Sequence, residues 1–493
     1  MRSENKMANV AVLVAVVIVV ISILYQCLRP IFRAPSSKDG VKVAKAEDKW
    51  TTAKKIPGME KRHSEDGNLQ DITEAGGFVD FLFKLHAKYG YVASFWYGKH
   101  YYVSLASPQA WKDHIKVFDR PVELFEFSRP LIGDNCLQTA NGKEGKTRRK
   151  IYDVSFQNDA LQNYYKDVQE VADDTVEKLS SIPSGENISL QQHVPLYVSM
   201  AFGRVFYGDF FKDEEKVIAL RDNYETTMEA LNQKISDVGP ANEEKFNTAL
   251  NTWRGIVQEA IQHRRDNPPL REEDRNFLDV LIDFCVTDEL LFTDAAIFYI
   301  GGYHTTTYMI VWMIYFMARD IKVQDKVHEE LVEVLGNERN VNLKNQSQLR
   351  YLKRVIDETI RCSVLAPFAA RVNFEEDMKV LDYTIPKGTG VIHALGVVLA
   401  DKAIWPDPER FDPDRFLPEK VAERHKLAFS PFGFAGKRIC PAYRVSHAEA
   451  FVLLATLCRK FKFHLVGGQN IKRKYGFVTL PSEEVKITLE KRE

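Results

Sequence analysis

Cys440 stands in a loop whose residue types suit a reactive thiolate. The run Ser430-Pro-Phe-Gly-Phe-Ala-Gly-Lys-Arg-Ile-Cys-Pro-Ala442 places Gly433 and Gly436 before the cysteine and Arg438 two places before it. The glycines let backbone come close to a bound group, and the arginine can meet an acidic one. A thiolate is also a strong metal ligand. Taken alone, the pattern equally fits an ordinary buried cysteine in a glycine-rich turn, so other motifs must decide.

The chemistry that such a loop favours is axial ligation of haem iron. A haem-binding thiolate requires small residues beside the porphyrin face, a cation for a propionate, and backbone N–H groups aimed at the sulfur. Gly436 and Arg438 provide the first two. Apolar residues at roughly helical spacing follow from 443 to 457. They predict a helix whose N-terminus faces the thiolate and stabilises negative charge.

A second charged group surrounds Glu358. The run Glu358-Thr-Ile-Arg361 lies on a predicted helix, and its i,i+3 spacing puts Glu358 and Arg361 on one face. The later run Phe411-Asp-Pro-Asp-Arg415-Phe416 would bury Arg415 among proline and aromatic residues. Two arginines and one glutamate can form a bidentate network inside a protein. Glu358, Arg361 and Arg415 are therefore predicted to be a structural triad.

Glu-x-x-Arg, Pro-Asp-Arg-Phe and Gly-x-Arg-x-Cys-Pro, in that order, resemble a microsomal cytochrome P450 over residues 56–493. Three further runs, at 65–69, 92–96 and 394–399, are most similar to family 20, subfamily A, whose substrates are unassigned. The resemblance implies a mainly α fold with a minor β sheet, the haem-thiolate fold of that family. It also implies haem as cofactor, with Cys440 as the metal ligand.

The resemblance assigns further residues to the haem. Arg371, in Pro367-x-x-x-Arg371, matches the strand arginine that meets a propionate, as does Arg438 in the cysteine loop. Arg148 and Arg149 match the basic pair of the family at the propionates, although the usual tryptophan before them is missing. With Gly436, these arginines are the predicted cofactor-binding residues.

The central motif departs from the family pattern. It reads Gly301-Gly-Tyr-His-Thr-Thr-Thr307 where the family has Ala-Gly-x-acid-Thr. Thr305 matches the catalytic threonine, the acid is replaced by His304, and the glycines would thin the helix for oxygen. Since histidine titrates near neutrality, we expect poorly coupled proton delivery that varies between about pH 6 and 8. The structural alternatives are a Thr305 hydroxyl bonded to its own turn and a His304 packed in a helix groove.

The cysteine loop departs as well. Phe432 stands eight places before Cys440, where the family has seven, so the loop carries one extra residue, most simply within Phe434-Ala435. Ala442 replaces the usual glycine two places after the sulfur.

The elements that must position these residues are mostly helices. Alternating residues from Gly90 to Ser107 predict a β-hairpin around Gly98. Residues 293–319 form a long apolar stretch whose Asp294 and His304 would be costly in lipid, so a helix through the protein interior is favoured over a second membrane span. A helix at 349–364 and strands at 371–374, 380–384 and 390–394 are also predicted.

The N-terminus predicts a membrane anchor. Residues 7–28 contain no charge and are long enough to cross a bilayer, and no cleavage site of a signal peptide is evident. Basic residues dominate the segment that follows, which places the body in the cytosol. We predict a transmembrane anchor at 1–28, a tether at 29–55 and a haem-thiolate domain at 56–493. The location expected is the endoplasmic reticulum membrane, single-pass.

Composition narrows the function classes. The chain is 45% hydrophobic and 27% charged with a formal net charge of −1, which indicates a globular protein and no nucleic-acid partner. Its six cysteines are scattered without zinc-binding spacing, as in a reducing compartment.

The resemblance implies a monooxygenase that acts on a lipophilic substrate. Electrons would come from NADPH through a cytochrome reductase, with cytochrome b5 as a second partner and membrane lipid around the anchor. Two alternatives stay open: a haem-thiolate isomerase or dehydratase of an oxygenated lipid, and a non-catalytic haem-binding protein.

Overall fold

The computed structural model describes residues 55–235, 242–336 and 340–492. Residues 56–493 form one unit, separate from residues 1–55. The anchor predicted at 1–28 and all but the last residue of the tether lie outside the described residues. Within the described ranges, no helix combines the length and the apolar character that a membrane span needs.

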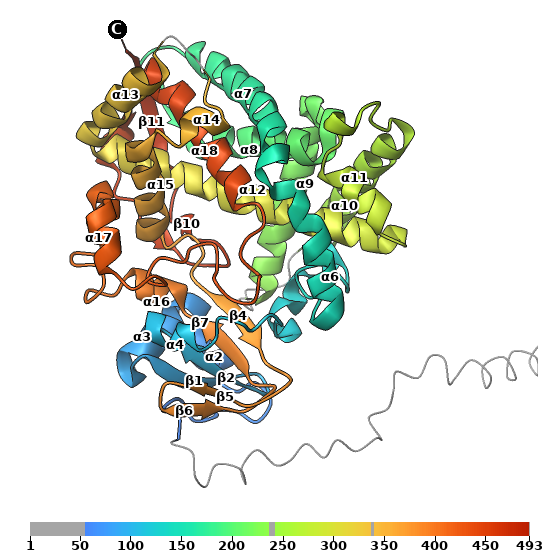
Figure 1. Ribbon diagram of the computed structural model, residues 1–493, viewed down its shortest axis with the longest axis vertical. Coiled ribbons are helices and arrows are strands. Elements are labelled where there is room, and N and C mark those ends of the chain that lie inside the picture. Colours follow the sequence, from blue (N-terminus) through green and yellow to red (C-terminus); the bar gives the residue numbers. More distant parts are fainter. Residues whose placement is uncertain (1–54, 236–241, 337–339, 493) are drawn as a thin grey trace, which may run out of the picture. The chain divides into compact units, whose positions relative to one another are not determined.

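The fold is mainly helical with small sheets, which confirms the predicted class (Figure 1). The α-helices are α2 (Leu69–Ala75), α3 (Phe78–Tyr89), α4 (Pro108–Lys112), α5 (Arg129–Ile132), α6 (Gly142–Tyr152), α7 (Asn158–Ser180), α8 (Leu190–Tyr207), α9 (Glu214–Ile235), α10 (Glu243–Asp266), α11 (Phe277–Phe284), α12 (Asp288–Arg319), α13 (Ile321–Leu335), α14 (Leu343–Gln346), α15 (Arg350–Ser363), α16 (Leu395–Leu399), α17 (Pro418–Glu423) and α18 (Tyr443–Lys460). The 3-10 helices are η1 (Val122–Ser128), η2 (Asp153–Phe156), η3 (Gly208–Lys212), η4 (Glu272–Asp274), η5 (Pro413–Phe416) and η6 (Val466–Gly468). The strands are β1 (Val92–Tyr97), β2 (His100–Leu105), β3 (Ile188–Ser189), β4 (Ala369–Val372), β5 (Met378–Val380), β6 (Tyr383–Ile385), β7 (Gly390–His393), β8 (Phe461–Leu465), β9 (Arg473–Lys474), β10 (Leu480–Pro481) and β11 (Lys486–Lys491).

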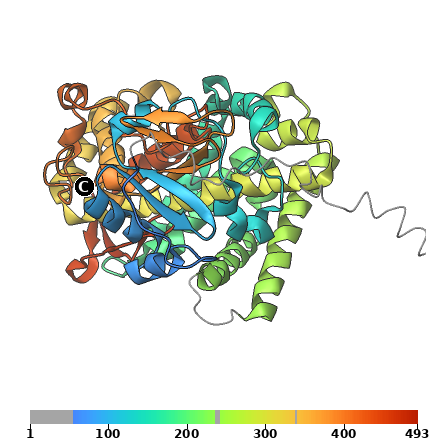
Figure 2. The ribbon, with the colours of Figure 1, turned by 90° about the horizontal axis from the view of Figure 1, so that it is seen from below.

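The largest sheet has the strand order β1-β2-β7-β4 and lies at one end of the unit, with α2 and α3 beside it (Figures 1 and 2). The predicted hairpin is confirmed: β1 and β2 pair antiparallel around Gly98, whose φ is 58°. β7 then runs parallel to β2 and antiparallel to β4. The strand predicted at 380–384 is wrong in one respect. A turn with Leu381 at φ 52° splits it into β5 and β6.

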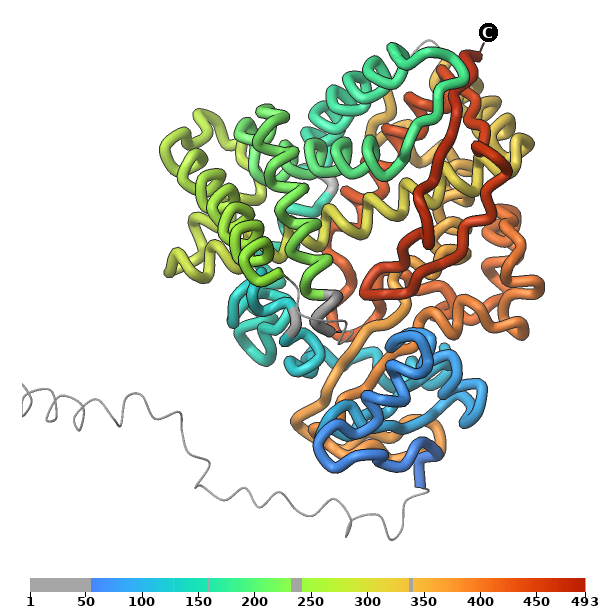
Figure 3. Tube along the Cα trace, turned by 180° about the vertical axis from the view of Figure 1, so that it is seen from behind, coloured from blue at the N-terminus to red at the C-terminus, as the bar shows by residue number. Residues whose placement is uncertain are grey.

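Helix α12 crosses the helical part of the molecule (Figure 3). It packs against α8, α15 and α18 and contributes to the largest apolar core. Thr287 caps its N-terminus by accepting a hydrogen bond from the backbone N–H of Leu290 at 3.2 Å. The predicted interior helix is thus confirmed, and its start lies five residues earlier than the apolar pattern indicated.

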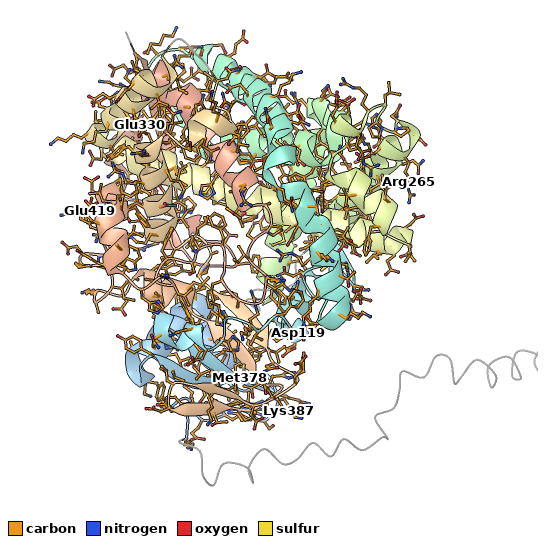
Figure 4. The ribbon with its side chains drawn as sticks, in the orientation of Figure 1. Asp119, Arg265, Glu330, Met378, Lys387 and Glu419 are labelled. Carbon is orange, nitrogen blue, oxygen red and sulfur yellow. The ribbon has the colours of Figure 1, made fainter. Side chains whose placement is uncertain are left out.

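Polar contacts fix the elements that carry the site. Glu330 of α13 accepts the N-terminal N–H groups of Tyr351 and Leu352 at 2.6 and 2.9 Å and so orients α15 (Figure 4). Asp119, between the sheet and α6, accepts from the N–H of Gly142 at 2.7 Å, and its carbonyl accepts from Val372 of β4 at 2.9 Å (Figure 4). The sheet and α6 are therefore tied together beside the cysteine loop.

Candidate functional site

The cysteine loop is a tight reversal that leads into α18. The N–H of Cys440 donates to the carbonyl of Phe432 at 2.8 Å, and Gly433 and Gly436 have φ values of 81° and 64°. Gly436 donates to the carbonyl of Ile115 at 2.7 Å, and a Cβ there would lie 2.2 Å from the carbonyl oxygen of Val117. The glycine expected to bind the cofactor therefore lets the loop dock on the segment after α4.

The surroundings of the Cys440 sulfur act on the pKa of its thiol in two opposite directions. Burial raises the pKa of the Cys440 thiol, because a low-dielectric environment disfavours the thiolate. The backbone N–H of Ala442, which directly precedes α18, lowers that pKa, and Arg149 and Arg120 lower it further. The predicted helix after the cysteine is confirmed, with its first residues next to the sulfur.

Three buried or half-buried arginines near the loop lack an acidic partner. Within the described ranges, Arg120, Arg371 and Arg438 form no ion pair, and the Nε of Arg371 has no hydrogen-bond partner. Burial first, and then the neighbouring arginines, lowers the pKa of Arg438 to about 8 and that of Arg371 well below its usual range. Because such a cluster is costly unless an anion joins it, the two propionates of haem fit these residues.

Arg438 is also held by backbone. Its guanidinium donates to the carbonyls of Phe118 at 3.3 Å, Leu137 at 2.8 Å and Ala140. Its charged carbon stacks 4.0 Å from the centre of the Phe118 ring. These contacts fix the cation in the segment that approaches the cysteine loop.

The structure separates the two arginines of α6. Arg149 donates to Asp153 at 2.8 Å and to the carbonyl of Ile439, beside Cys440, at 2.7 Å. Arg148 instead donates to Asp294 of α12, with Nε at 3.1 Å from the carboxylate. Further bonds from Arg148 to Asn135 and Glu144 occupy its remaining donors. Arg148, predicted to bind the cofactor, therefore joins α6 to α12 through a buried ion pair, whereas Arg149 reaches the cysteine loop.

The two glycines of the central motif have different surroundings. A Cβ at Gly301 would meet nothing within 4 Å, whereas one at Gly302 would lie 2.0 Å from the ring of Phe202. Gly302 therefore allows α12 to pack against α8, and only Gly301 faces open space. The hydroxyl of Thr305 donates to the carbonyl of Gly301 at 2.7 Å, so the structural alternative for this hydroxyl is the one observed.

His304 faces α9. Its Nδ1 lies 3.4 Å from the hydroxyl of Tyr224, and its ring is 5.1 Å from that of Tyr308. Burial lowers the pKa of His304 to about 4. With this pKa the ring is neutral between pH 6 and 8, so its own titration is not expected to govern activity in that range.

The charged triad forms as its spacing predicted. Arg361 donates two hydrogen bonds to the carboxylate of Glu358, at 2.7 and 2.8 Å. The Nε of Arg415 lies 3.3 Å from the same carboxylate. The Arg415 contact is an ion pair without good hydrogen-bond direction, because that Nε has no hydrogen-bond partner. The backbone N–H of Asp412 completes the set at 2.8 Å, which joins α15 to the segment before η5.

The Phe434-Ala435 segment, where an extra loop residue is predicted, anchors the cysteine loop to the sheet end. The ring of Phe434 stacks on Trp111, with centroids 5.2 Å apart, and lies 4.7 Å from the ring of His393 in β7. Ala435, beside it, is fully buried. Phe434 therefore gives the cysteine loop an aromatic contact with the α4 and β7 regions.

Three functional candidates escaped the sequence motifs. Arg120, in an Asp-Arg-Pro run, joins the arginines that lack an acidic partner near the cysteine loop. Asp294 pairs with Arg148, and Glu449 of α18 is buried with neither carboxyl oxygen hydrogen-bonded. The one signal for Glu449 in the sequence is an acidic residue, nine positions after Cys440, within a stretch that is predicted to be an apolar helix.

Comparison with known proteins matches this geometry. The cytochrome P450 family profile covers residues 57–489. Cytochrome P450 20A1 of Rattus norvegicus is 31% identical over 442 residues, covering 89% of this chain and 93% of its own. Cytochrome P450 20A1 of Homo sapiens is likewise 31% identical over 441 residues, with the same coverage. The crystal structure of the cytochrome P450DA heme domain superposes with a TM-score of 0.76 at 19% identity, over 89% of this chain and 98% of that one. The chain belongs to the cytochrome P450 family.

Proposed function

We propose that this P450-type oxidoreductase inserts one oxygen atom into a lipophilic substrate, using electrons from NADPH that a reductase of the same membrane delivers. The observation that carries the proposal is the half-buried Cys440 below a cluster of arginines that lack acidic partners. Haem, when bound there, supplies oxygen activation. The protein supplies the ligand, the cations for the propionates and the accessible face of α12.

The residues divide the work as follows. Cys440 donates electron density through its sulfur, and the N–H of Ala442 tempers the charge on it. Arg120, Arg149, Arg371 and Arg438 orient the acidic edge of the cofactor. Thr305 and His304 stand where the family places its proton-handling pair, but the threonine hydroxyl donates within its own turn and the histidine is neutral. We therefore propose that oxygen activation is poorly coupled, with much NADPH lost to peroxide.

The experiment that tests the proposal measures NADPH and oxygen consumption by the haem-loaded protein with cytochrome reductase. Addition of cytochrome b5 tests it as a second electron donor. His304→Asp should lower the peroxide formed per NADPH, and Thr305→Ala should raise it. A screen of sterols, fatty acids and retinoids for shifts of the Soret band would identify substrates. Absence of reductase-dependent oxygen consumption with every ligand that shifts the band would contradict the proposal.

One observation favours a second candidate, a haem-thiolate isomerase or dehydratase of an oxygenated lipid. Such a reaction needs no proton relay, and neither Thr305 nor His304 provides an acid at neutral pH. Turnover of a lipid hydroperoxide without reductase would support it. Equal product formation with and without NADPH would then separate it from the monooxygenase.

We also propose that the protein resides in the endoplasmic reticulum membrane with its catalytic domain in the cytosol. The support is the uncharged run at 7–28 and the basic residues after it. A lipophilic substrate would reach the site from the same membrane.

A further inference from the structure

One face of α12 remains accessible although the helix passes through the core. The accessible or partly accessible positions on this face are Ile297, Ile300, Gly301, His304, Thr305 and Tyr308. They recur every three or four residues and therefore lie on one side of the helix. Positions between them, such as Tyr299, Tyr303 and Thr306, are buried. The face is apolar at its start and becomes polar from His304 onward.

The His304 ring presents a single fixed donor on this face. The hydroxyl of Tyr224 lies 3.4 Å from Nδ1 of His304, and we assign the donor role to the phenol, because within the described ranges it has no other acceptor. The neutral ring then carries its proton on Nε2. Within the described part of the chain, Nε2 has no hydrogen-bond partner and is not among the polar atoms that protein encloses.

Tyr308 adds a second neutral donor one turn later. Its ring centre is 5.1 Å from that of His304, and burial raises the pKa of its phenol to about 12. In the described ranges, its hydroxyl also has no hydrogen-bond partner and is not enclosed by protein. Two donors that lack acceptors therefore lie together on an otherwise apolar face.

The charge around these donors disfavours an anion. None of the six accessible positions carries a Lys or Arg side chain. Glu225 of α9 accepts a hydrogen bond from Tyr303 and lies close enough to Tyr308 to raise its pKa. Burial raises the pKa of Glu225, while Tyr303 and Arg221 lower it, so Arg221 already compensates this carboxylate. No cation stands on the accessible face itself to pair with a carboxylate ligand, whereas a neutral acceptor needs none.

We propose that His304 and Tyr308 bind an uncharged oxygen of the substrate, a ketone or alcohol group on an apolar skeleton. Tyr224 is the positioning residue, since it fixes the tautomer that makes Nε2 a donor. The inference rests on the proposed monooxygenase function and names the substrate class for the same site. A site with unpaired donors rejects analogues that lack the acceptor, because the donors then stay unsatisfied.

The test compares three probes of equal chain length: tridecan-2-one, tridecane and tridecanoate. Their affinities for the full-length, haem-loaded protein are measured from the shift of the Soret band. We expect the ketone to bind about tenfold more tightly than the alkane, the effect of one hydrogen bond. The carboxylate should bind more weakly than the ketone. His304→Phe should abolish the ketone preference while alkane affinity and haem content stay unchanged.

Two phenol deletions on neighbouring residues separate positioning from packing. Tyr224→Phe should reduce the ketone preference, because Nδ1 loses its donor and the ring tautomer is no longer fixed. Tyr303→Phe removes a phenol that donates to Glu225 rather than to His304, and it should keep the preference. Equal reduction of the preference in both variants would show that packing alone is responsible.

Three results would overturn the inference: equal affinity of wild type for ketone and alkane, binding of neither, or an unchanged preference in His304→Phe. Oxygen consumption with reductase, measured on the same samples, tests the proposed function separately. A ketone preference without oxygen consumption would refute the monooxygenase and leave the binding site intact. Oxygen consumption without a ketone preference would refute the proposed binding site and leave the monooxygenase function intact.

Discussion

At the scale of single residues, the site depends on which atoms each side chain can reach. Cys440 is half-buried in the loop before α18, whereas Cys458, within α18, is fully buried. Only the first has an arginine two places before it and a backbone N–H directed at its sulfur. The loop cysteine and the helix cysteine are therefore expected to behave differently.

Cys440→His should abolish the red-shifted Soret band that a thiolate gives the carbon monoxide complex of reduced haem. The measurement is a carbon monoxide difference spectrum of the purified variant. Cys458→Ala is the matched control and should keep the band, because that thiol is buried in the apolar core, away from the cysteine loop. A red-shifted band in Cys440→His would refute the assignment of the ligand.

The adjacent glycines of α12 should tolerate alanine differently. Gly302→Ala places a Cβ against Phe202, and such overpacking costs about 1–3 kcal/mol. Gly301→Ala meets open space and gains helix propensity of up to about 1 kcal/mol. Thermal unfolding of the two haem-loaded variants should therefore place Gly302→Ala below wild type and Gly301→Ala at or above it. Equal midpoints would mean that Phe202 moves aside.

At the scale of elements, buried carboxyl groups lie where segments distant in the chain meet. Glu358 joins α15 to the segment around η5, and Glu449 lies on α18 where Thr306 of α12 approaches it. These contacts explain why the helices around the cysteine loop keep one arrangement. Each can be tested by replacing one carboxyl group and leaving its neighbours in place.

Glu358→Ala should give little folded, haem-loaded protein. The change leaves Arg361 buried without its partner, at a cost of about 3–5 kcal/mol. Asp414→Asn is the control, because that half-exposed carboxylate pairs with Arg354 near the surface and contributes at most about 1 kcal/mol. The yield and haem content of both variants measure the difference. Normal haem loading with lowered turnover in Glu358→Ala would indicate a direct catalytic role instead.

Glu449 should make stability fall as pH rises. Burial raises its pKa well above the usual 4.5, although Thr306 lowers it in part. The unfolded chain releases this proton above about pH 4.5 while the folded protein keeps it. The stabilisation is complete below that pH and declines by about 1.4 kcal/mol per pH unit up to the folded pKa.

Glu449→Gln should remove this decline. Its unfolding midpoint, relative to wild type, is expected to rise from pH 5 to pH 8. Glu419→Gln, at the exposed α17, is the control and should follow wild type at every pH (Figure 4). A constant difference between Glu449→Gln and wild type would show that Glu449 is ionised in the folded protein.

At the scale of the whole molecule, the chain combines an acidic body with an uncharged N-terminal run at 7–28 and the basic residues after it. An acidic body gives no general attraction to anionic lipid, so the expected attachment depends on the N-terminal segment. The described domain, in contrast, buries its long apolar helix α12 among other helices.

Removal of residues 1–28 should release much of the protein from microsomes into a carbonate wash, whereas the full chain should stay in the membrane pellet. Protease added to sealed microsomes should degrade the body of the full-length protein. Protection of the body until detergent opens the vesicles would show that the topology is inverted.

The sequence by itself determined the features that depend on local spacing. The cysteine loop and the helix after it, the Glu358–Arg361 pair and the hairpin around Gly98 all involve residues close in the chain. Their geometry follows from the periods of helix and strand, which is why these predictions are confirmed.

Only the tertiary structure decided which distant groups meet. Arg148 and Asp294 are 146 residues apart in the chain, and Tyr224 and His304 are 80 apart. The sequence motif does not distinguish Arg148 from Arg149. In the structure, the side chain of Arg148 points toward α12 and that of Arg149 toward the cysteine loop. The protonation of His304 likewise follows from burial beneath α9, which no local pattern encodes.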